Sequence, residues 1–174
     1  MKRGLFGFNP LALIASGLMA IAMYYPWWSF RLEISPMQSD IYPYVIIGPA
    51  SELVGYKRSP QMTILTVVLI ASIVICLLGS FFKRRVGSIL LVTSSLLVFL
   101  GCWRLMLRLA SIAARFDLSL QGEGFGTYEG FASVRAWTWI RPGLYLALLG
   151  GVLALIAGLL NNKISLGGRK DPPK

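Results

Sequence analysis

Four long apolar runs, separated by polar or charged stretches, make up most of this chain. Charged residues are nearly absent within the runs and crowd between them, which is typical of chains that cross a lipid bilayer. The pattern predicts an all-α membrane protein, a four-transmembrane-helix antiparallel bundle with a small extracytoplasmic cap, in a single membrane domain of residues 1–174. The predicted helices cover residues 10–25, 61–82, 86–112 and 141–160.

An outer loop, a tight inner turn and a second outer loop join the helices, and a tail follows the last one: residues 26–60, 83–85, 113–140 and 161–174. In the first outer loop, apolar and polar residues alternate from Trp28 to Ser35, which is the period of a half-buried strand. A second β-prone run, Ile41 to Ile47, contains Pro43 and fits only an edge strand. We therefore expect a folded cap, for which a short β-sheet is one option.

The second outer loop divides into two parts. Gln121 to Gly126 is rich in glycine and lacks the Gly-Lys-Ser/Thr ending of a phosphate-binding loop, so it predicts a flexible outer loop. Residues 128–140 are aromatic and mixed, and one further strand of the cap is an option there.

The placement of Lys and Arg predicts the orientation of the helices. The N-terminus, the inner turn and the tail hold nine of the 17 basic residues and one of the seven acids, and the two outer segments hold the remaining eight and six. The positive-inside rule gives most weight to Lys and Arg in short loops. The dense Lys83-Arg84-Arg85 triplet and the basic termini therefore predict a multi-pass cell-membrane protein with both termini in the cytoplasm.

Composition agrees with a membrane protein and argues against several functions. The residues are 56% hydrophobic and 14% charged, and the mean hydropathy is +0.67. The net charge of +10 collects at the ends of apolar runs, where it meets lipid headgroups, so we do not expect nucleic-acid binding. The sequence has no histidine, and no acid lies within a predicted span. We therefore expect no enzyme activity, no proton-coupled transport, no metal site and no cofactor.

Two features inside the predicted helices concern packing. Cys76 and Cys102 should lie at depths that differ by about 15 Å, whereas a disulfide needs Cα atoms within about 7 Å. We therefore expect both cysteines to be free. We expect Ser94 and Ser95 to hydrogen-bond back to their own helix.

Three arginines form a row near the outer end of the third predicted helix. Arg104, Arg108 and Arg115 are spaced i, i+4 and i+11, which places them within about 40° of one another around the helix. Three interpretations fit this spacing. The arginines could extend to the outer headgroups, bind an anionic lipid or ligand, or clamp the cap to the bundle by pairing with cap carboxylates: Glu33, Glu52 and Glu129.

Small residues recur at intervals of four on two faces of the last predicted helix. One row is Gly143, Ala147 and Gly151, and the other is Gly150, Ala154 and Gly158. In lipid, such spacing lets helix backbones approach closely. The rows predict either packing within the bundle or an interface with a partner protein or a second copy.

Aromatic residues cluster where the predicted helices reach the membrane surface, and we interpret them as interface anchors: Tyr24, Tyr25, Trp27, Trp28, Trp137 and Trp139. The first apolar run also resembles a secretory signal, because Lys2-Arg3 precedes it and Ala20-Ile21-Ala22 fits an A-x-A cleavage site. The apolar and aromatic residues that continue after Ala22 favour an uncleaved helix.

The predicted plan, with four helices, a long first outer segment of β character and Trp27-Trp28 after the first helix, resembles claudin-type four-helix membrane proteins. The resemblance covers topology along most of the chain. Claudins carry Gly-Leu-Trp followed by two cysteines in the first outer loop, and this chain has no cysteine there. The resemblance therefore implies the arrangement and does not imply adhesion or pore formation.

Two functions fit these residues. The first is a non-catalytic accessory or scaffold subunit that docks a partner through its small-residue helix faces and outer cap. The second is a lipid- or small-molecule-binding or transport protein that uses the outer arginine row. The expected partners are membrane lipids and either a membrane protein or a second copy of the chain.

Overall fold

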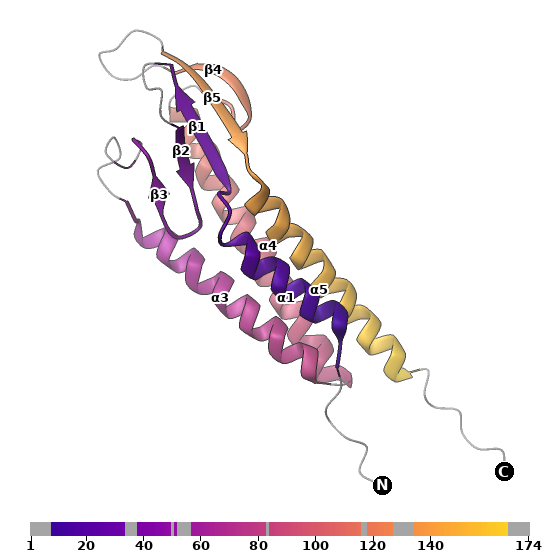
Figure 1. Ribbon diagram of the computed structural model, residues 1–174. Coiled ribbons are helices and arrows are strands. Elements are labelled where there is room, and N and C mark those ends of the chain that lie inside the picture. Colours follow the sequence, from indigo (N-terminus) through magenta and orange to yellow (C-terminus); the bar gives the residue numbers. More distant parts are fainter. Residues whose placement is uncertain are drawn as a thin grey trace, which may run out of the picture.

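The computed structural model describes residues 8–33, 38–49, 51, 57–82, 84–115, 118–126 and 134–166. Within these ranges, long helices pack side by side and carry a five-stranded sheet at one end (Figure 1). The helices are α1 (Pro10–Ala22), α3 (Pro60–Phe81), α4 (Arg84–Arg115) and α5 (Pro142–Leu166).

Three of these helices are long and apolar enough to cross a membrane. At 1.5 Å per residue, α3, α4 and α5 are about 33, 48 and 38 Å long, against a hydrocarbon core of about 30 Å. Large apolar side chains such as Ile64, Leu100 and Leu149 are exposed along them, as lipid contact requires. The structure is thus mostly helical and agrees with the predicted membrane class, whereas three of the four predicted spans reach this length among the described residues.

Helix α1 is shorter than the predicted residues 10–25. It has 13 residues, or about 20 Å, and ends at Ala22. The reason lies in the residues that follow it. Tyr25 precedes Pro26, and a residue before proline avoids the α conformation. The carbonyl of Ala22 accepts a hydrogen bond from the indole of Trp27 at 2.8 Å.

The other helix boundaries differ less from the prediction. Helix α3 begins at Pro60, and the hydroxyl of Ser59 caps it by accepting from the Met62 N–H at 3.3 Å. Helix α4 covers Arg84–Arg115, against the predicted 86–112, so the inner turn is even tighter than expected. Helix α5 continues to Leu166, into the segment predicted as a tail.

The helices form a bundle in which α1 and α4 each contact both α3 and α5. The start of α1, the α3–α4 turn and the end of α5 lie at the end away from the sheet (Figure 1). Two hydrogen bonds tie this end together. The Asn9 N–H donates to the carbonyl of Ser80 at 2.9 Å, and the side-chain amide of Asn161 donates to the carbonyl of Phe82 at 3.4 Å.

The cap contains the sheet that the sequence left as an option. Its strands are β1 (Trp28–Leu32), β2 (Gln38–Ile41), β3 (Ile46–Ile47), β4 (Gly122–Gly126) and β5 (Val134–Ile140). The strand order is β3-β2-β1-β5-β4, and every neighbouring pair is antiparallel. Strand β1 from the first outer loop pairs with β5 from the second, so the two loops form one structure.

The prediction of a flexible loop at Gln121 to Gly126 is wrong, because Gly122–Gly126 is strand β4. Glycine is a poor strand former alone, but here Gly122, Gly124 and Gly126 pair with the β-branched and small residues Thr138, Ala136 and Val134 of β5. Backbone pairing with a well-formed neighbour therefore overrides the local preference.

One face of the sheet joins the core of the bundle. Trp28, Ile41 and Ile46 are buried in the same hydrophobic cluster as Leu105 and Leu109 of α4. The indole of Trp28 donates to the carbonyl of Leu120 at 2.8 Å, so it also fixes the segment that leads into β4. The sheet and this part of α4 therefore contribute to one hydrophobic core.

Hydroxyl groups link helices inside the bundle. Ser94 Oγ donates to the carbonyl of Ser72 on α3 at 2.8 Å, so the prediction that it bonds to its own helix is wrong. Ser95 Oγ is buried and has no hydrogen-bond partner among the described residues. Ser88 Oγ donates to the carbonyl of Gly158 on α5 at 2.6 Å. Cys76 and Cys102 are both free, as predicted.

Candidate functional site

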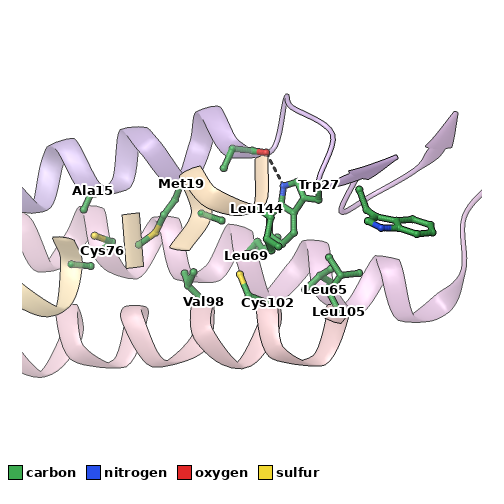
Figure 2. Close-up of a cluster of buried hydrophobic side chains, with 14 of the residues drawn as sticks. Ala15, Met19, Trp27, Leu65, Leu69, Cys76, Val98, Cys102, Leu105 and Leu144 are labelled. Atoms are coloured by element: carbon green, nitrogen blue, oxygen red, sulfur yellow. Dashed lines mark hydrogen bonds between the residues drawn. The ribbon is translucent and has the colours of Figure 1, made fainter. Parts of the chain in front are cut away.

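The junction between bundle and sheet is built around Trp27. This side chain is 1% exposed, and Figure 2 shows it beside Leu144 and Leu69, with its indole nitrogen directed at the carbonyl of Ala22. The Trp27 carbonyl accepts from the Arg141 N–H at 3.0 Å, where β5 passes into α5. The sheet is therefore fixed to two helices at one point.

The predicted aromatic anchors separate into two groups. Tyr24 and Tyr25 are exposed, in keeping with an interface position. Trp27 and Trp28 are buried, so their prediction as surface anchors is wrong: each indole N–H finds a backbone carbonyl inside the protein. Trp137 and Trp139 lie on strand β5.

The two small-residue rows of α5 are filled by helices of the same chain. A Cβ added to Gly150 would lie 2.8 Å from Met19 Cγ of α1. A Cβ on Gly151 or Gly158 would meet α4, at 3.2 Å from Phe99 and 3.1 Å from Val92. Ala147 and Ala154 are fully buried, and Gly143 lies against Trp27. Both rows therefore serve packing within the bundle, which is one of the two predicted alternatives.

The arginine row is described in part. Arg104 is exposed, and Arg108 is half-buried, with its Nη1 donating to Ser59 Oγ at 3.2 Å and to Gln61 Oε1. The side chain of Arg115, and Glu52 and Glu129, lie outside the described residues. Arg108 lines a hollow of about 370 Å³ beside the N-terminus of α3, here named the Arg108 hollow, with Arg58, Ser59, Pro60 and Gln61.

The face of the sheet that points away from the core carries charged and aromatic side chains. We call it the exposed face and define it by Arg31, Glu33, Glu123, Phe125, Arg135, Trp137 and Trp139. On its β4–β5 half, Arg135 Nε lies 2.6 Å from Glu123 Oε1. The guanidinium of Arg135 also stacks on two rings, 5.6 Å from the centroid of Phe125 and 6.0 Å from that of Trp137.

The centre of the exposed face is hollowed. Arg31, Glu33, Trp137 and Trp139 line a depression of about 380 Å³, which we call the Arg31 hollow. Arg31 stands directly opposite Trp137 in the β1–β5 register, and Trp139 stands opposite Ser29. Neither Arg31 nor Glu33 forms an ion pair with another residue that the structure describes. The hollow is therefore lined by two indoles and by two opposite charges that form no ion pair with each other.

A partly buried chain of hydrogen bonds lies beside this hollow. Arg141 Nε donates to Ser29 Oγ at 2.8 Å, and Ser29 Oγ donates to Asp40 Oδ1 at 2.5 Å. Gln38 Nε2 donates to the same oxygen at 2.6 Å. The guanidinium of Arg141 also stacks over Trp139, at 5.8 Å from a ring centroid. Trp139 is thus held from one side although it is 37% exposed.

Sequence reasoning found only part of this site. It named Trp137 and Trp139 as membrane anchors and Glu33 as a clamp for the arginine row, and it gave Arg31 no role. The available signal was the alternation in residues 134–140, where Arg135, Trp137 and Trp139 share one face of a strand. Among the described residues, no group of three or more His, Cys, Asp or Glu could hold a metal ion.

The chain matches a known family over most of its length. A family model described as "Tryptophan-associated transmembrane protein (Trp_oprn_chp)" matches residues 11–164. This range includes every described helix and strand apart from the first residue of α1 and the last two of α5. No curated protein matches the chain.

Proposed function

The chain belongs to the family of tryptophan-associated transmembrane proteins, and on this premise we propose that it serves as a non-catalytic accessory or scaffold subunit of a membrane complex. The helices form the membrane part, and the sheet is the part that meets a partner. The small-residue rows of α5 are taken by α1 and α4, so the partner surface of this proposal lies on the cap.

The observation that carries the proposal is a sheet attached to the helices, with large side chains exposed on one face. Phe125 is 57% exposed and Ile47 is 53% exposed, at opposite ends of the sheet. The buried Trp27 and the bond from the Arg141 N–H fix this sheet to the bundle. Exposed aromatic residues and arginines on a rigid support are the usual anchors of protein interfaces.

The proposal includes an arrangement in the membrane. Helix α1 is a fourth crossing, both termini are cytoplasmic, and the sheet lies outside the cell membrane, in the arrangement that claudin-type proteins have. Supporting this, Ala12, Ala15 and Met19 of α1 are buried against the other helices. Cleavage after Ala22 would remove this packed helix, so the proposal keeps it as part of the mature protein.

Native mass spectrometry of the detergent-extracted protein tests the accessory role. We expect a foreign subunit in fixed stoichiometry, and we expect Phe125→Ser on the exposed face to remove it. The matched control is Leu100→Ala, which changes an equally exposed side chain on the lipid-facing side of α4. A bare monomer, or a complex that Phe125→Ser leaves intact, contradicts the proposal.

A second candidate, an anionic-lipid site, is favoured by the Arg108 hollow. Arg58 and Arg108 line it together, next to the first turn of α3, where the positive end of the helix dipole favours negative charge. In this candidate Arg108 keeps its bonds to Ser59 and Gln61 while its charge faces a lipid phosphate.

Lipid retention tests this second candidate. We expect the purified wild type to retain an anionic lipid in native mass spectra and Arg108→Leu to lose it while remaining folded. Arg85→Leu is the control, because Arg85 is exposed at the opposite end of α4. Equal retention by the two variants would exclude a specific site at Arg108.

A further inference from the structure

We propose that the Arg31 hollow binds an aromatic α-amino acid, with Arg31 on its carboxylate, Glu33 on its ammonium group and Trp137 and Trp139 against its ring. This inference goes beyond the accessory role, because it assigns a small-molecule ligand to a hollow in the exposed face. The ligand and the protein partner are tested by different experiments. It rests on the placement of four side chains that line one hollow, three of them on the paired strands β1 and β5 and Glu33 directly after β1.

Arg31 and Glu33 both line the hollow. They are two residues apart, a rise of about 7 Å along an extended backbone, and Glu33 follows directly after the last residue of β1. An α-amino acid carries its carboxylate and ammonium on one carbon, so it can meet a guanidinium and a carboxylate that line one hollow. A simple anion would leave Glu33 uncompensated, and a simple cation would leave Arg31 uncompensated.

The charges are available for a ligand. Neither has an ion-pair partner among the described residues, whereas Arg135 and Glu123 on the same face already pair at 2.6 Å. Arg135 and Glu123 therefore show that opposite charges on this face can neutralise each other in an ion pair. Arg31 and Glu33 line the same hollow and make no such pair.

The two indoles select the ring. Trp137 lies directly across from Arg31, and Trp139 lies one step further along the same face of β5. Aromatic side chains prefer offset or edge-to-face contact with another ring, and a ring in the hollow also excludes water from the charge contacts. An aliphatic amino acid would satisfy the charges alone.

The site is held in place before a ligand arrives. Arg141 stacks on Trp139 at 5.8 Å and bonds to Ser29 beneath it at 2.8 Å, while Arg135 stacks on Trp137 at 6.0 Å. Because both indoles are supported, ordering them costs little on binding. The hollow of about 380 Å³ is open to water, so we expect a weak, rapidly exchanging ligand.

The test is titration of the full-length protein in detergent with L-tryptophan, followed by ligand-observed NMR. We expect saturable binding with a Kd on the order of 0.5 mM, the affinity typical of efficient ligands of this size. Tryptamine lacks the carboxylate, indole-3-propionate lacks the ammonium and L-alanine lacks the ring. Each should bind at least about tenfold more weakly, because each leaves a charge or the indoles unused.

Variants locate the site. Arg31→Gln and Trp139→Leu should each weaken L-tryptophan binding by about tenfold or more, and both residues are exposed enough for the fold to survive. Lys57→Gln removes an exposed charge elsewhere in the cap and should bind like the wild type. Unchanged thermal unfolding confirms that Arg31→Gln is folded.

Three results would overturn the proposal. They are the absence of saturable binding up to about 10 mM, equal affinity for indole-3-propionate and L-tryptophan, and unchanged affinity in Arg31→Gln. None of them bears on the foreign subunit expected in native mass spectra, so the ligand site and the accessory role fail separately.

Discussion

The small-residue rows of α5 follow the repeat of a helix, and the exposed face of the sheet follows the repeat of a strand. Other parts of the chain cover the rows of α5, whereas the face of the sheet is left exposed. On α5, Gly150 and Gly151 point at two different neighbours and leave no room for a methyl group without movement. On the sheet, Trp139 and Phe125 stand in solvent. Periodicity therefore marks a face, and the size and charge of its residues decide whether the chain itself covers that face.

The physical reason differs between the two regions. In lipid, apolar burial gives little driving force, so helices associate by close backbone approach, which small residues permit. In water, the buried face of the sheet takes the apolar residues, and the other face keeps arginines and tryptophans with a polar or aromatic partner. The comparison separates residues that stabilise the fold from exposed residues that can bind another molecule.

The largest expected effect comes from filling the α5 contact at Gly143. A Cβ there would lie 2.4 Å from Trp27 Cδ1 and 2.6 Å from the carbonyl oxygen of Tyr25, and the backbone atom cannot move aside cheaply. We expect Gly143→Ala to lower the free energy of unfolding by at least about 3 kcal/mol or to prevent folding. Thermal unfolding in detergent by circular dichroism measures this.

The control for that prediction is Gly17→Ala on α1. A Cβ at Gly17 meets nothing within 4 Å, and alanine is the better helix former by about 1 kcal/mol. Gly17→Ala should therefore be neutral or stabilising. Equal losses in both variants would show that α5 is not packed as described.

The next effect compares two tryptophans. Trp27→Phe removes a buried indole and its 2.8 Å bond to the Ala22 carbonyl, so we expect a loss of about 2–3 kcal/mol in unfolding free energy. Trp139→Phe alters an exposed side chain and should change it by less than about 0.5 kcal/mol. Chemical denaturation of the two variants, side by side, gives the difference. Similar losses would mean that the sheet face is as packed as the junction.

A smaller effect compares adjacent serines of α4. Ser94→Ala removes the bond to the Ser72 carbonyl and should cost about 1 kcal/mol. Ser95→Ala removes a buried hydroxyl that has no partner among the described residues, so it should be neutral or stabilising. The readout is the midpoint of thermal unfolding. A larger loss for Ser95→Ala than for Ser94→Ala would reverse the assignment.

The smallest expected effect is on the exposed face itself. Arg135 and Glu123 pair at 2.6 Å, but their side chains are 45% and 46% exposed. A double-mutant cycle with Arg135→Gln and Glu123→Gln should give a coupling of about 0.2–1 kcal/mol, and added salt should reduce it. A salt-independent coupling above that range would indicate that the face is covered.

The sequence predicted the membrane class, the positions of α3, α4 and α5, and the presence of a folded cap, because these depend on long apolar runs and local alternation. It did not predict β4, because this strand depends on pairing with β5, as between Gly124 and Ala136. The local sequence of β4 does not reveal that pairing. It also misplaced Trp27 and Trp28. A tryptophan after an apolar run is typical of a membrane surface, and only the return of α5 beside it shows that it is buried.

The candidate site was harder to predict than the fold for a related reason. Arg31 and Trp137 are far apart in sequence and meet only because β1 pairs with β5. The arginine row was visible because its members share one helix. Contacts within an element can be read from spacing, whereas contacts between the two outer loops require their register.

The length of α4 has a consequence for the sheet. At about 48 Å, the helix exceeds a hydrocarbon core of about 30 Å by roughly twelve residues, close to the stretch from Arg104 to Arg115. Leu105 and Leu109 in this stretch share a core with Trp28 and Ile41, so we expect the sheet and the helix to tilt together.

Spanning helices adjust their tilt to the thickness of the bilayer. A thinner membrane should therefore rotate the whole sheet toward the lipid surface, and a thicker one should raise it. Oriented solid-state NMR in short- and long-chain lipids measures this angle, and an angle that does not change would show that the sheet is oriented independently of α4. If the angle does change with lipid length, the exposed face presents the same residues at an orientation set by the surrounding lipid.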